Sequence, residues 1–392
     1  MKRRWISALT ALMLAAVLGV TAPMAGTAAP LEADENGFVA GSCSLTVYSE
    51  DPNKEETGGF GEDLAGAGVV VDLYQIARAV KTPGYDTYHY ELLPEYDLEI
   101  PGTVEGEVRQ SAENWEALAQ QAAAMVLDEE NPGTAVSGSG VAAGTRISEL
   151  EAGLYLVVAH GSDMTGISDY KTEVGQTDAV SGEEIRQIAT IAHSGQYTYA
   201  FLPQLVSLPA KPADEEGAGN TANPGEWMFD VTVNLKPEQS SRYGALEIVK
   251  TLSEYETMGG AEESATFVFE VTGRINGEEV YSNVESITFT AAGQESVVLD
   301  RIPAGAEVTV TEVYSGSSYR LTVPGERSAV VGADEVASVT FENEYDGRRT
   351  NGHGIKNQFV YDEGQGAWNW YSSPVQNANG NQGLPPAAER NY

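Results

Sequence analysis

Three segments in the second half of the chain each end a run of alternating apolar residues on a polar residue of a reactive type. These residues are Lys250, Glu312 and Asn343, and the apolar residues that precede them are Leu246 and Ile248, Val308 and Val310, and Val339 and Phe341. Because side chains two positions apart lie on the same face of a strand, all three polar side chains are expected to point inward. A buried cation and a buried anion cost several kcal/mol unless they are paired or neutralised. Their positions therefore require a chemical explanation.

An amide bond between Lys250 and Asn343 would explain this pattern. Burial lowers the pKa of a lysine and gives a neutral amine nucleophile, and it raises the pKa of a glutamate, so that Glu312 can hold a proton. Glu312 would then polarise the Asn343 carboxamide and carry protons while ammonia leaves. The bond would join the first and last strands of the domain, as a disulfide does elsewhere. The residues alone equally allow a noncovalent Lys–Glu pair, or strand ends that reach solvent.

The sequence around these residues predicts a β-sandwich. Seven short segments with strand-like alternation follow one another at a spacing that is typical of two packed sheets. The expected strands are 245–250, 266–271, 286–290, 296–299, 307–313, 319–323 and 338–343.

Residues 245–345 resemble the Cna protein B-type domain of Gram-positive surface proteins and pili. The resemblance lies in GALEIVK at 244–250, FVFEV at 267–271, IPAG at 302–305 followed by VTVTE at 308–312, and VTFEN at 339–343. In that family the Lys, Glu and Asn at these places form an intramolecular isopeptide bond. The resemblance implies that Lys250 is bonded to Asn343 and that Glu312 is the proton shuttle.

Residues 41–238 predict a further β domain, with one amphipathic helix over 111–127. This region resembles the amino-terminal domain of sortase-assembled pilins. Asn114-Trp115 in the helix, LEAGLYLV at 150–157, YTYAFLPQLVSLP at 197–209 and WMFDVTV at 227–233 occur in the order of that domain. The fold class expected for the chain is all-β, with tandem immunoglobulin-like or prealbumin-like sandwiches, the first of which contains the inserted helix.

Lys236 is a candidate site for attachment of another subunit. In the pilin family the last strand of this domain runs into a Tyr-Pro-Lys-Asn motif, whose Lys is the acceptor for sortase polymerisation. Here the corresponding residues are Asn234-Leu235-Lys236-Pro237, so only the Lys is retained. Its parity in the strand predicts an outward side chain that an enzyme can reach. An ordinary surface lysine is the alternative.

The first domain is expected to lack a cross-link of its own. The places that correspond to the reactive Lys, Glu and Asn are occupied by Ser49, Ala159 and Pro237. All three are uncharged, as a noncovalent core requires, because one retained charge would be buried without a partner.

The two ends of the chain lie outside these domains. Residues 1–28 have a basic start, an apolar run and small residues, which predict a secretory signal peptide, and no later segment predicts a membrane span. Residues 346–392 form a Gly- and Asn-rich tail with one expected hairpin, and no Leu-Pro-x-Thr-Gly sorting signal is present in it. Cys43 is the only cysteine, so no intrachain disulfide is expected.

The composition disfavours several classes of function. With 58 Asp and Glu against 22 Lys and Arg, the formal charge is −36, which disfavours binding to nucleic acid. The four histidines have no metal-ligand spacing, and neither a Gly-x-Ser-x-Gly elbow nor a phosphate-binding loop occurs. We therefore expect no cofactor, no metal and no enzymatic activity apart from the protein's own maturation.

The function expected from these features is that of a secreted, pilin-like or adhesin-like structural protein on the surface of a Gram-positive bacterium, in a pilus or at the cell wall. Its expected partners are other pilin subunits, joined through a sortase. The alternative is a secreted module that binds a carbohydrate or host ligand, with Trp368, Trp370 and Tyr371 as a stacking surface. A hairpin packed onto the preceding sandwich explains the same aromatic residues better, because an isolated two-stranded hairpin needs a hydrophobic support.

Overall fold

The fold is described from a computed structural model, which describes residues 30–50, 61–100, 112–177, 184–211, 227–256, 264–316, 318–346, 358–362 and 367–371. Strands predominate among these residues, and the helices are α1 (Gly61–Gly66), α2 (Ala112–Val126) and α3 (Ile167–Tyr170). The predicted all-β class is therefore confirmed, with α2 as the predicted helix. The predicted signal peptide lies outside the described residues.

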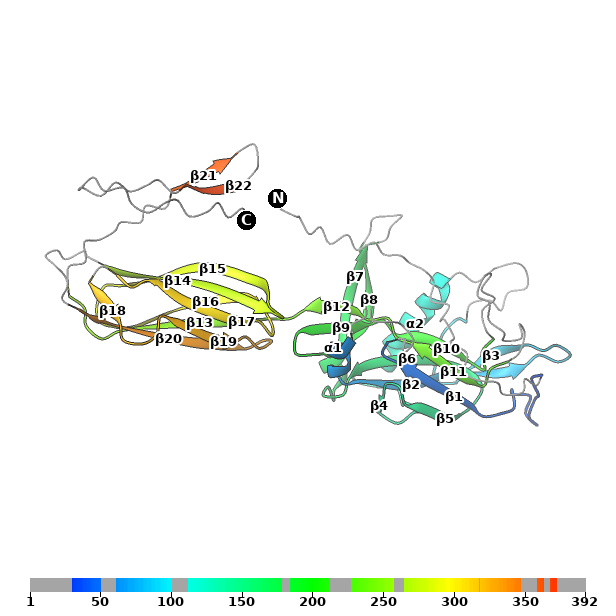
Figure 1. Cartoon of the computed structure of the whole chain (residues 1–392). Coiled ribbons are helices and arrows are strands. Elements are labelled where there is room, and N and C mark those ends of the chain that lie inside the picture. The colour runs from blue at the N-terminus through cyan, green and yellow to red at the C-terminus, as the bar shows by residue number, and fades with distance from the viewer. Residues whose placement is uncertain are drawn as a thin grey trace.

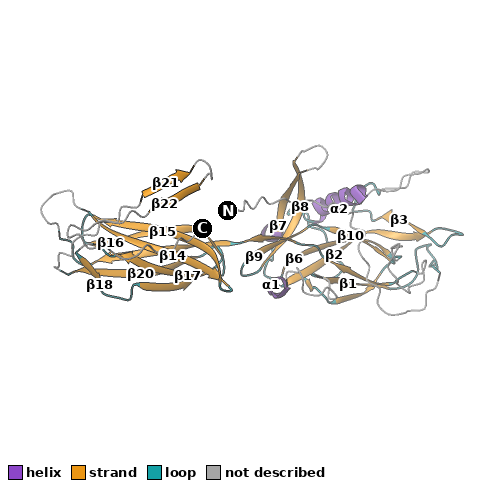
Figure 2. Cartoon of the chain, turned by 45° about the horizontal axis from the view of Figure 1, so that its top comes forward, coloured by secondary structure: helices purple, strands orange, loops and turns teal. Residues whose placement is uncertain are grey.

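Two sandwich units lie end to end along the chain (Figure 1), and a view turned by 45° gives the same arrangement (Figure 2). We call the unit that ends with β12 the first unit, and the unit that begins with β13 the second unit. No helix among the described residues is long and apolar enough to cross a membrane.

The second unit consists of two four-stranded sheets, in the orders β16-β13-β20-β18 and β15-β14-β17-β19. Its first and last strands, β13 and β20, are parallel neighbours. The strands are β13 (Tyr243–Leu252), β14 (Ala265–Ile275), β15 (Glu278–Phe289), β16 (Gly293–Pro303), β17 (Glu307–Tyr314), β18 (Tyr319–Leu321), β19 (Glu326–Val330) and β20 (Val336–Tyr345). There are thus eight strands where the sequence predicts seven, because Glu-Arg-Ser-Ala-Val in β19 has too little apolar alternation to be recognised.

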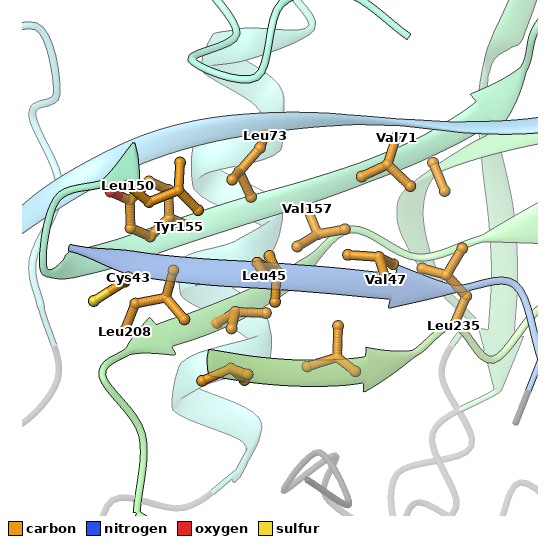
Figure 3. Packing of buried hydrophobic residues seen from close by; sticks show 14 of the residues in the cluster. Cys43, Leu45, Val47, Val71, Leu73, Leu150, Tyr155, Val157, Leu208 and Leu235 are labelled. Atoms are coloured by element: carbon orange, nitrogen blue, oxygen red, sulfur yellow. The ribbon is translucent and has the colours of Figure 1, made fainter. Parts of the chain in front are cut away.

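The first unit is built around a three-stranded sheet, β11-β1-β5, and a sheet in the order β10-β6-β2-β3, in which β4 also pairs with β2. Figure 3 shows apolar side chains gathered between these sheets, among them Leu45 and Val47 from β1, Leu73 from β2 and Val157 from β6. The strands are β1 (Cys43–Tyr48), β2 (Val69–Lys81), β3 (Tyr88–Leu92), β4 (Val141–Ala142), β5 (Arg146–Leu150), β6 (Gly153–Gly161), β10 (Gln204–Leu208) and β11 (Asp230–Asn234).

A further sheet of the first unit, in the order β12-β9-β8-β7, leads toward the second unit. Its strands are β7 (Lys171–Thr177), β8 (Glu184–His193), β9 (Tyr197–Phe201) and β12 (Glu238–Ser241). The β-rich run at 197–208, whose sequence reads as one strand, is therefore two strands. The chain breaks at Leu202-Pro203, and β9 and β10 belong to different sheets. Pro203 has no N–H to donate, which favours such a break.

The two units share one strand topology. In each sandwich the first strand pairs in parallel with a strand from the end of the unit, β1 with β11, which precedes β12, and β13 with β20, the last strand of the second unit. It also pairs antiparallel with a middle strand, β5 or β16. The second strand, β2 or β14, lies between an antiparallel hairpin partner and β6 or β17. The first unit is thus the same sandwich, enlarged by α2 between β3 and β5 and by β7 to β9 between β6 and β10.

Helix α2 covers part of the first unit through an apolar stripe at helical spacing. Leu118, Ala122 and Val126 on this stripe are buried. Gln120 on α2 acts as a substitute for a strand, because its side-chain amide accepts from the Ile188 N–H at 2.6 Å and donates to the Ile188 carbonyl at 3.0 Å. The helix thereby satisfies backbone groups of β8 at Ile188, which lies before the stretch of β8 that pairs with β9.

The tail contains one antiparallel hairpin, β21 (Gln358–Asp362) with β22 (Ala367–Tyr371), in the region where the sequence predicts one. The side chains of Trp368, Trp370 and Tyr371 lie outside the described part of the structure. The stacking surface therefore stays a prediction.

Gly153→Ala should destabilise the first unit. Gly153 begins β6 at a bulge in its pairing with β2, and an added Cβ would collide with the Ala77 carbonyl oxygen. Overpacking of this kind costs about 1–3 kcal/mol. Urea unfolding should show the loss, whereas Gly66→Ala, whose Cβ meets no atom within 4 Å, should shift stability by no more than about 0.5 kcal/mol. Equal midpoints for the two variants would contradict the close approach of β2 and β6.

Candidate functional site

Lys250 on β13, Glu312 on β17 and Asn343 on β20 meet in the core of the second unit. The Lys250 and Glu312 side chains have no exposed surface, and Asn343 is fully buried. Lys250 Nζ donates to Glu312 Oε2 at 2.7 Å and to Asn343 Oδ1 at 2.5 Å. Asn343 Nδ2 donates to Glu312 Oε1 at 2.6 Å. The three side chains thus form a closed ring of contacts.

Strand register brings these residues together. In the parallel pair β13–β20, Lys250 lies opposite Phe341, and Asn343 is two residues farther along the same face. Glu312 comes from the facing sheet, where it pairs with Phe269 of β14. The lysine and the asparagine therefore share one sheet, and the glutamate reaches them across the core.

Aromatic rings exclude water from the lysine amine. Lys250 Nζ lies 4.7 Å from the ring centroid of Phe267 and 5.9 Å from that of Phe269. Phe341 packs on Phe269 with ring centroids 5.1 Å apart. Desolvation by burial lowers the pKa of Lys250, and the hydrogen bond and charge of Glu312 oppose this effect without cancelling it. The amine therefore gives up its proton more readily than that of an exposed lysine, and the neutral form is the nucleophile.

Glu312 is expected from the sequence to polarise the Asn343 carboxamide, and its carboxylate contacts this carboxamide at the nitrogen atom. One oxygen, Oε2, lies on the amine of Lys250, and the other, Oε1, lies on Asn343 Nδ2. Nδ2 also lies 3.4 Å from the carbonyl oxygen of Ser315, a partly exposed residue that directly follows β17. A single carboxylate thus connects the two nitrogen atoms.

Sequence reasoning did not find Ser253, which holds the backbone at Asn343. The Asn343 carbonyl oxygen accepts from both the N–H and the Oγ of Ser253 at 3.3 Å. Ser253 lies beyond the alternating run that ends at Lys250, so the period-two pattern gave no signal for it.

Lys236 lies away from this ring, between β11 and β12 in the first unit. Val231, Val233 and Leu235 are buried and Lys236 is exposed, so the side chain has the outward parity expected from the sequence.

Ser49, Ala159 and Pro237 of the first unit lie at the strand positions that correspond to the reactive residues of the second unit. Val47 pairs with Val233 and Tyr48 with Asn234, which puts Ser49 opposite Leu235, with Pro237 two residues farther on. This is the offset between Lys250 and Asn343 in the second unit. Ala159 on β6 pairs with Val71 of the adjacent β2, as Glu312 on β17 pairs with a residue of β14. None of the three residues carries an amine, an acid or a carboxamide.

In the described residues, neither Cys43 nor a group of metal ligands forms a second reactive site. Cys43 is buried, and burial raises the pKa of its thiol to about 12, so little thiolate forms at neutral pH. Among the described residues, no group of three or more His, Cys, Asp or Glu side chains has the geometry to hold a metal ion.

Comparison with known proteins gives one family match, over residues 246–346, to a family described as "Domain of unknown function (DUF5979)". This match coincides with the second unit. No curated protein matches the chain.

Several solved structures are similar in part. An adhesin from Mobiluncus mulieris with intramolecular disulfide, isopeptide and ester bond cross-links is 14% identical over 49% of this chain and 77% of its own, with a TM-score of 0.23. A minor pilin from Streptococcus agalactiae is 12% identical over 78% and 96%, with a TM-score of 0.21. The Bacillus anthracis TIE protein is 12% identical over 78% and 34%, with a TM-score of 0.25. At such identities and TM-scores, likeness to an adhesin or a pilin assigns no activity to this chain.

Asn343→Ala should make the stability of the second unit depend on the charge of Lys250, because it removes the group that the amine could attack. The pKa of buried Lys250 is lowered from the ordinary value of 10.5, so between the two values the unfolded chain binds a proton that the folded chain does not. The free energy of unfolding should therefore be lowest below the folded pKa, rise with pH through this window and level off above 10.5.

Urea unfolding at a series of pH values measures this rise. The double variant Asn343→Ala/Lys250→Met is the control, because it has no amine to titrate at this position and keeps the groups that do not contact Lys250. If both variants gave the same dependence on pH, Lys250 would not carry the buried charge.

Proposed function

We propose that Lys250 and Asn343 form an intramolecular isopeptide bond in a secreted, pilin-like or adhesin-like structural protein of the Gram-positive cell surface. The observation that supports this proposal is the closed ring of contacts among three fully enclosed side chains. An amine that already touches the Asn343 oxygen at 2.5 Å has the carbonyl carbon only one C=O bond beyond, about 1.23 Å. Because the fold already holds the amine against the carboxamide, the reaction avoids most of the entropic cost of bringing two separate molecules together.

The first step is a proton transfer from Lys250 Nζ to Glu312 Oε2, along the 2.7 Å contact. The neutral amine then attacks the Asn343 carbonyl carbon, a new C–N bond forms, and negative charge develops on Oδ1. Nζ carries the matching positive charge at this stage, and it sheds this charge when it gives up a proton in the next step.

The second step expels the amide nitrogen. The Glu312 carboxyl group turns and gives the proton that it accepted on Oε2 to Asn343 Nδ2, which already contacts this carboxyl group. The carboxylate then accepts the surplus proton of Nζ in return. The C–Nδ2 bond breaks, and ammonia leaves on the side of the Ser315 carbonyl. It takes the proton from Glu312 as it goes, so one ammonium ion is released and the glutamate returns to its starting state.

The bond would suit a protein that bears tension. Because β13 and β20 are parallel, the chain enters the second unit at the start of β13 and leaves it at the end of β20, with the bond close to the exit. Tension along the chain would cross from Lys250 to Asn343 and bypass the residues between them. Lys250 and Asn343 are 93 positions apart. By the estimate for a disulfide that closes a loop of about 100 residues, a cross-link between them would raise the free energy of unfolding by about 4.7 kcal/mol, because it removes entropy from the unfolded chain.

The purified protein should be lighter than its sequence mass by one ammonia molecule, after allowance for removal of the leader. Glu312→Gln keeps the shape of the side chain but cannot exchange protons, so it should restore the full mass and lower the thermal stability. Intact mass spectrometry and peptide mapping of the Lys250–Asn343 link give the readout.

Two matched variants control this test. Glu270→Gln on β14 and Asn283→Ala on β15 change the same residue types in the same unit, outside the ring, and should keep the mass deficit. A well-folded parent protein at full sequence mass would overturn the proposal.

We further propose that Lys236 accepts another subunit through a sortase. Support comes from its exposed side chain at the end of the first unit and from its position in the pilin-like segment. Incubation with a pilus sortase and an anchored pilin should give a conjugate whose cross-linked peptide contains Lys236.

Lys236→Arg should abolish this conjugate, because arginine cannot act as the amine acceptor. Lys211→Arg is the matched control, since Lys211 is partly exposed but packs over Trp227 at 4.3 Å. Conjugation that persists in Lys236→Arg would exclude the acceptor role.

A further inference from the structure

The chain passes from the first unit to the second through a single residue. β12 ends at Ser241 and β13 begins at Tyr243, so Arg242 alone lies between strands that belong to different sandwiches. A linker this short leaves few backbone angles free, and the contacts of its one residue decide whether the junction bends.

Arg242 is held to the first unit by its backbone and by its side chain. Its N–H donates to the Gln196 carbonyl at 2.8 Å, and its Nη1 donates to the Ser194 carbonyl at 2.7 Å. Both acceptors belong to the turn between β8 and β9. Hydrogen bonds from a charged group to a carbonyl are stronger than neutral ones.

The same residue is held to the second unit. Its carbonyl accepts from the Ala304 N–H at 2.9 Å, in the turn between β16 and β17. Its Nη2 donates to Asp334 Oδ2 at 2.7 Å, in the turn between β19 and β20, where the Asp334 N–H also donates to Tyr243. Both backbone groups and both ends of the guanidinium group are thus engaged, on opposite sides of the junction.

Packing adds to these bonds. Gly305 of the second unit has φ +82° and lies against the side chain of Gln196, so close that an added Cβ would collide with the Gln196 amide. The Arg242 side chain is 20% exposed and that of Asp334 is 79% exposed. The ion pair alone is therefore weak, and the largely enclosed bond to Ser194 and the two backbone bonds hold the junction.

We propose that Arg242 makes the junction a rigid coupling, so that the two sandwiches keep one orientation in solution. Relative motion is the ordinary expectation for two units joined by a small contact. Here rotation about the linker would break bonds to three turns at once. The coupling does not depend on the isopeptide bond, which lies near the opposite end of the second unit.

Distance measurement between two nitroxide labels tests the proposal on the full chain. Glu91→Cys on β3 and Ser338→Cys on β20 provide exposed attachment sites in the two units. The native Cys43 is buried and its thiol pKa is raised, so it stays unlabelled. Pulsed electron double resonance should give a single narrow distance peak for the parent protein.

Arg242→Ala should broaden this peak, because it removes the enclosed bond to Ser194 and the ion pair with Asp334 and leaves only the two backbone bonds. Arg242→Lys, which can serve one acceptor, should give an intermediate width and provides the test if the alanine variant does not fold. Arg274→Ala is the control, since this exposed arginine pairs with Glu279 within the second unit. A broad distribution in the parent protein, or a peak in Arg242→Ala or Arg242→Lys as narrow as that of the parent, would overturn the proposal.

Discussion

The enclosure of one lysine amine is the constraint on which the second unit depends. Lys250 has no exposed surface, so its charge must be balanced by Glu312 or removed by proton transfer. Side chains alternate between the faces of a strand, so a slip of one residue in β13 or β20 would carry Lys250 or Asn343 to the outer face. The three side chains can contact one another in only one register of β13 and β20. Their contacts therefore stabilise the parallel pairing of the first and last strands in that register.

The first unit shows that this topology does not require the reactive residues. Its strands pair in the same order, yet Ser49, Ala159 and Pro237 occupy the corresponding positions. Additional elements provide packing there instead, since α2 covers one sheet and β7 to β9 extend the unit toward the junction. The sandwich fold therefore does not need the ring of polar side chains. The second unit has all three members of the ring, and the first unit has uncharged residues at all three positions. Partial replacement would leave a buried charge unpaired.

The period-two pattern was enough to predict the all-β class and the inward direction of Lys250, Glu312 and Asn343, because both follow from local strand geometry. It could not identify β19, whose residues lack strong alternation, or the change of sheet at Leu202-Pro203, which depends on the neighbouring strands. The contact of Glu312 with Nδ2 and the bond from Ser253 follow from how strands distant in sequence pack, as do the contacts of Arg242. Such contacts arise from tertiary structure and leave no trace in a local pattern.

Sequence separation also determines when the proposed bond can act. Lys250 and Asn343 are 93 positions apart and Lys250 and Glu312 are 62 apart, so neither pair can meet before most of the sandwich has formed. Nonlocal pairing of this kind is slow, because loop entropy is lost before the contacts are gained. The bond therefore cannot direct folding. As proposed, it would form on a folded core that already excludes water and would then hold together the first and last strands of the sandwich, which would make it a device against unfolding.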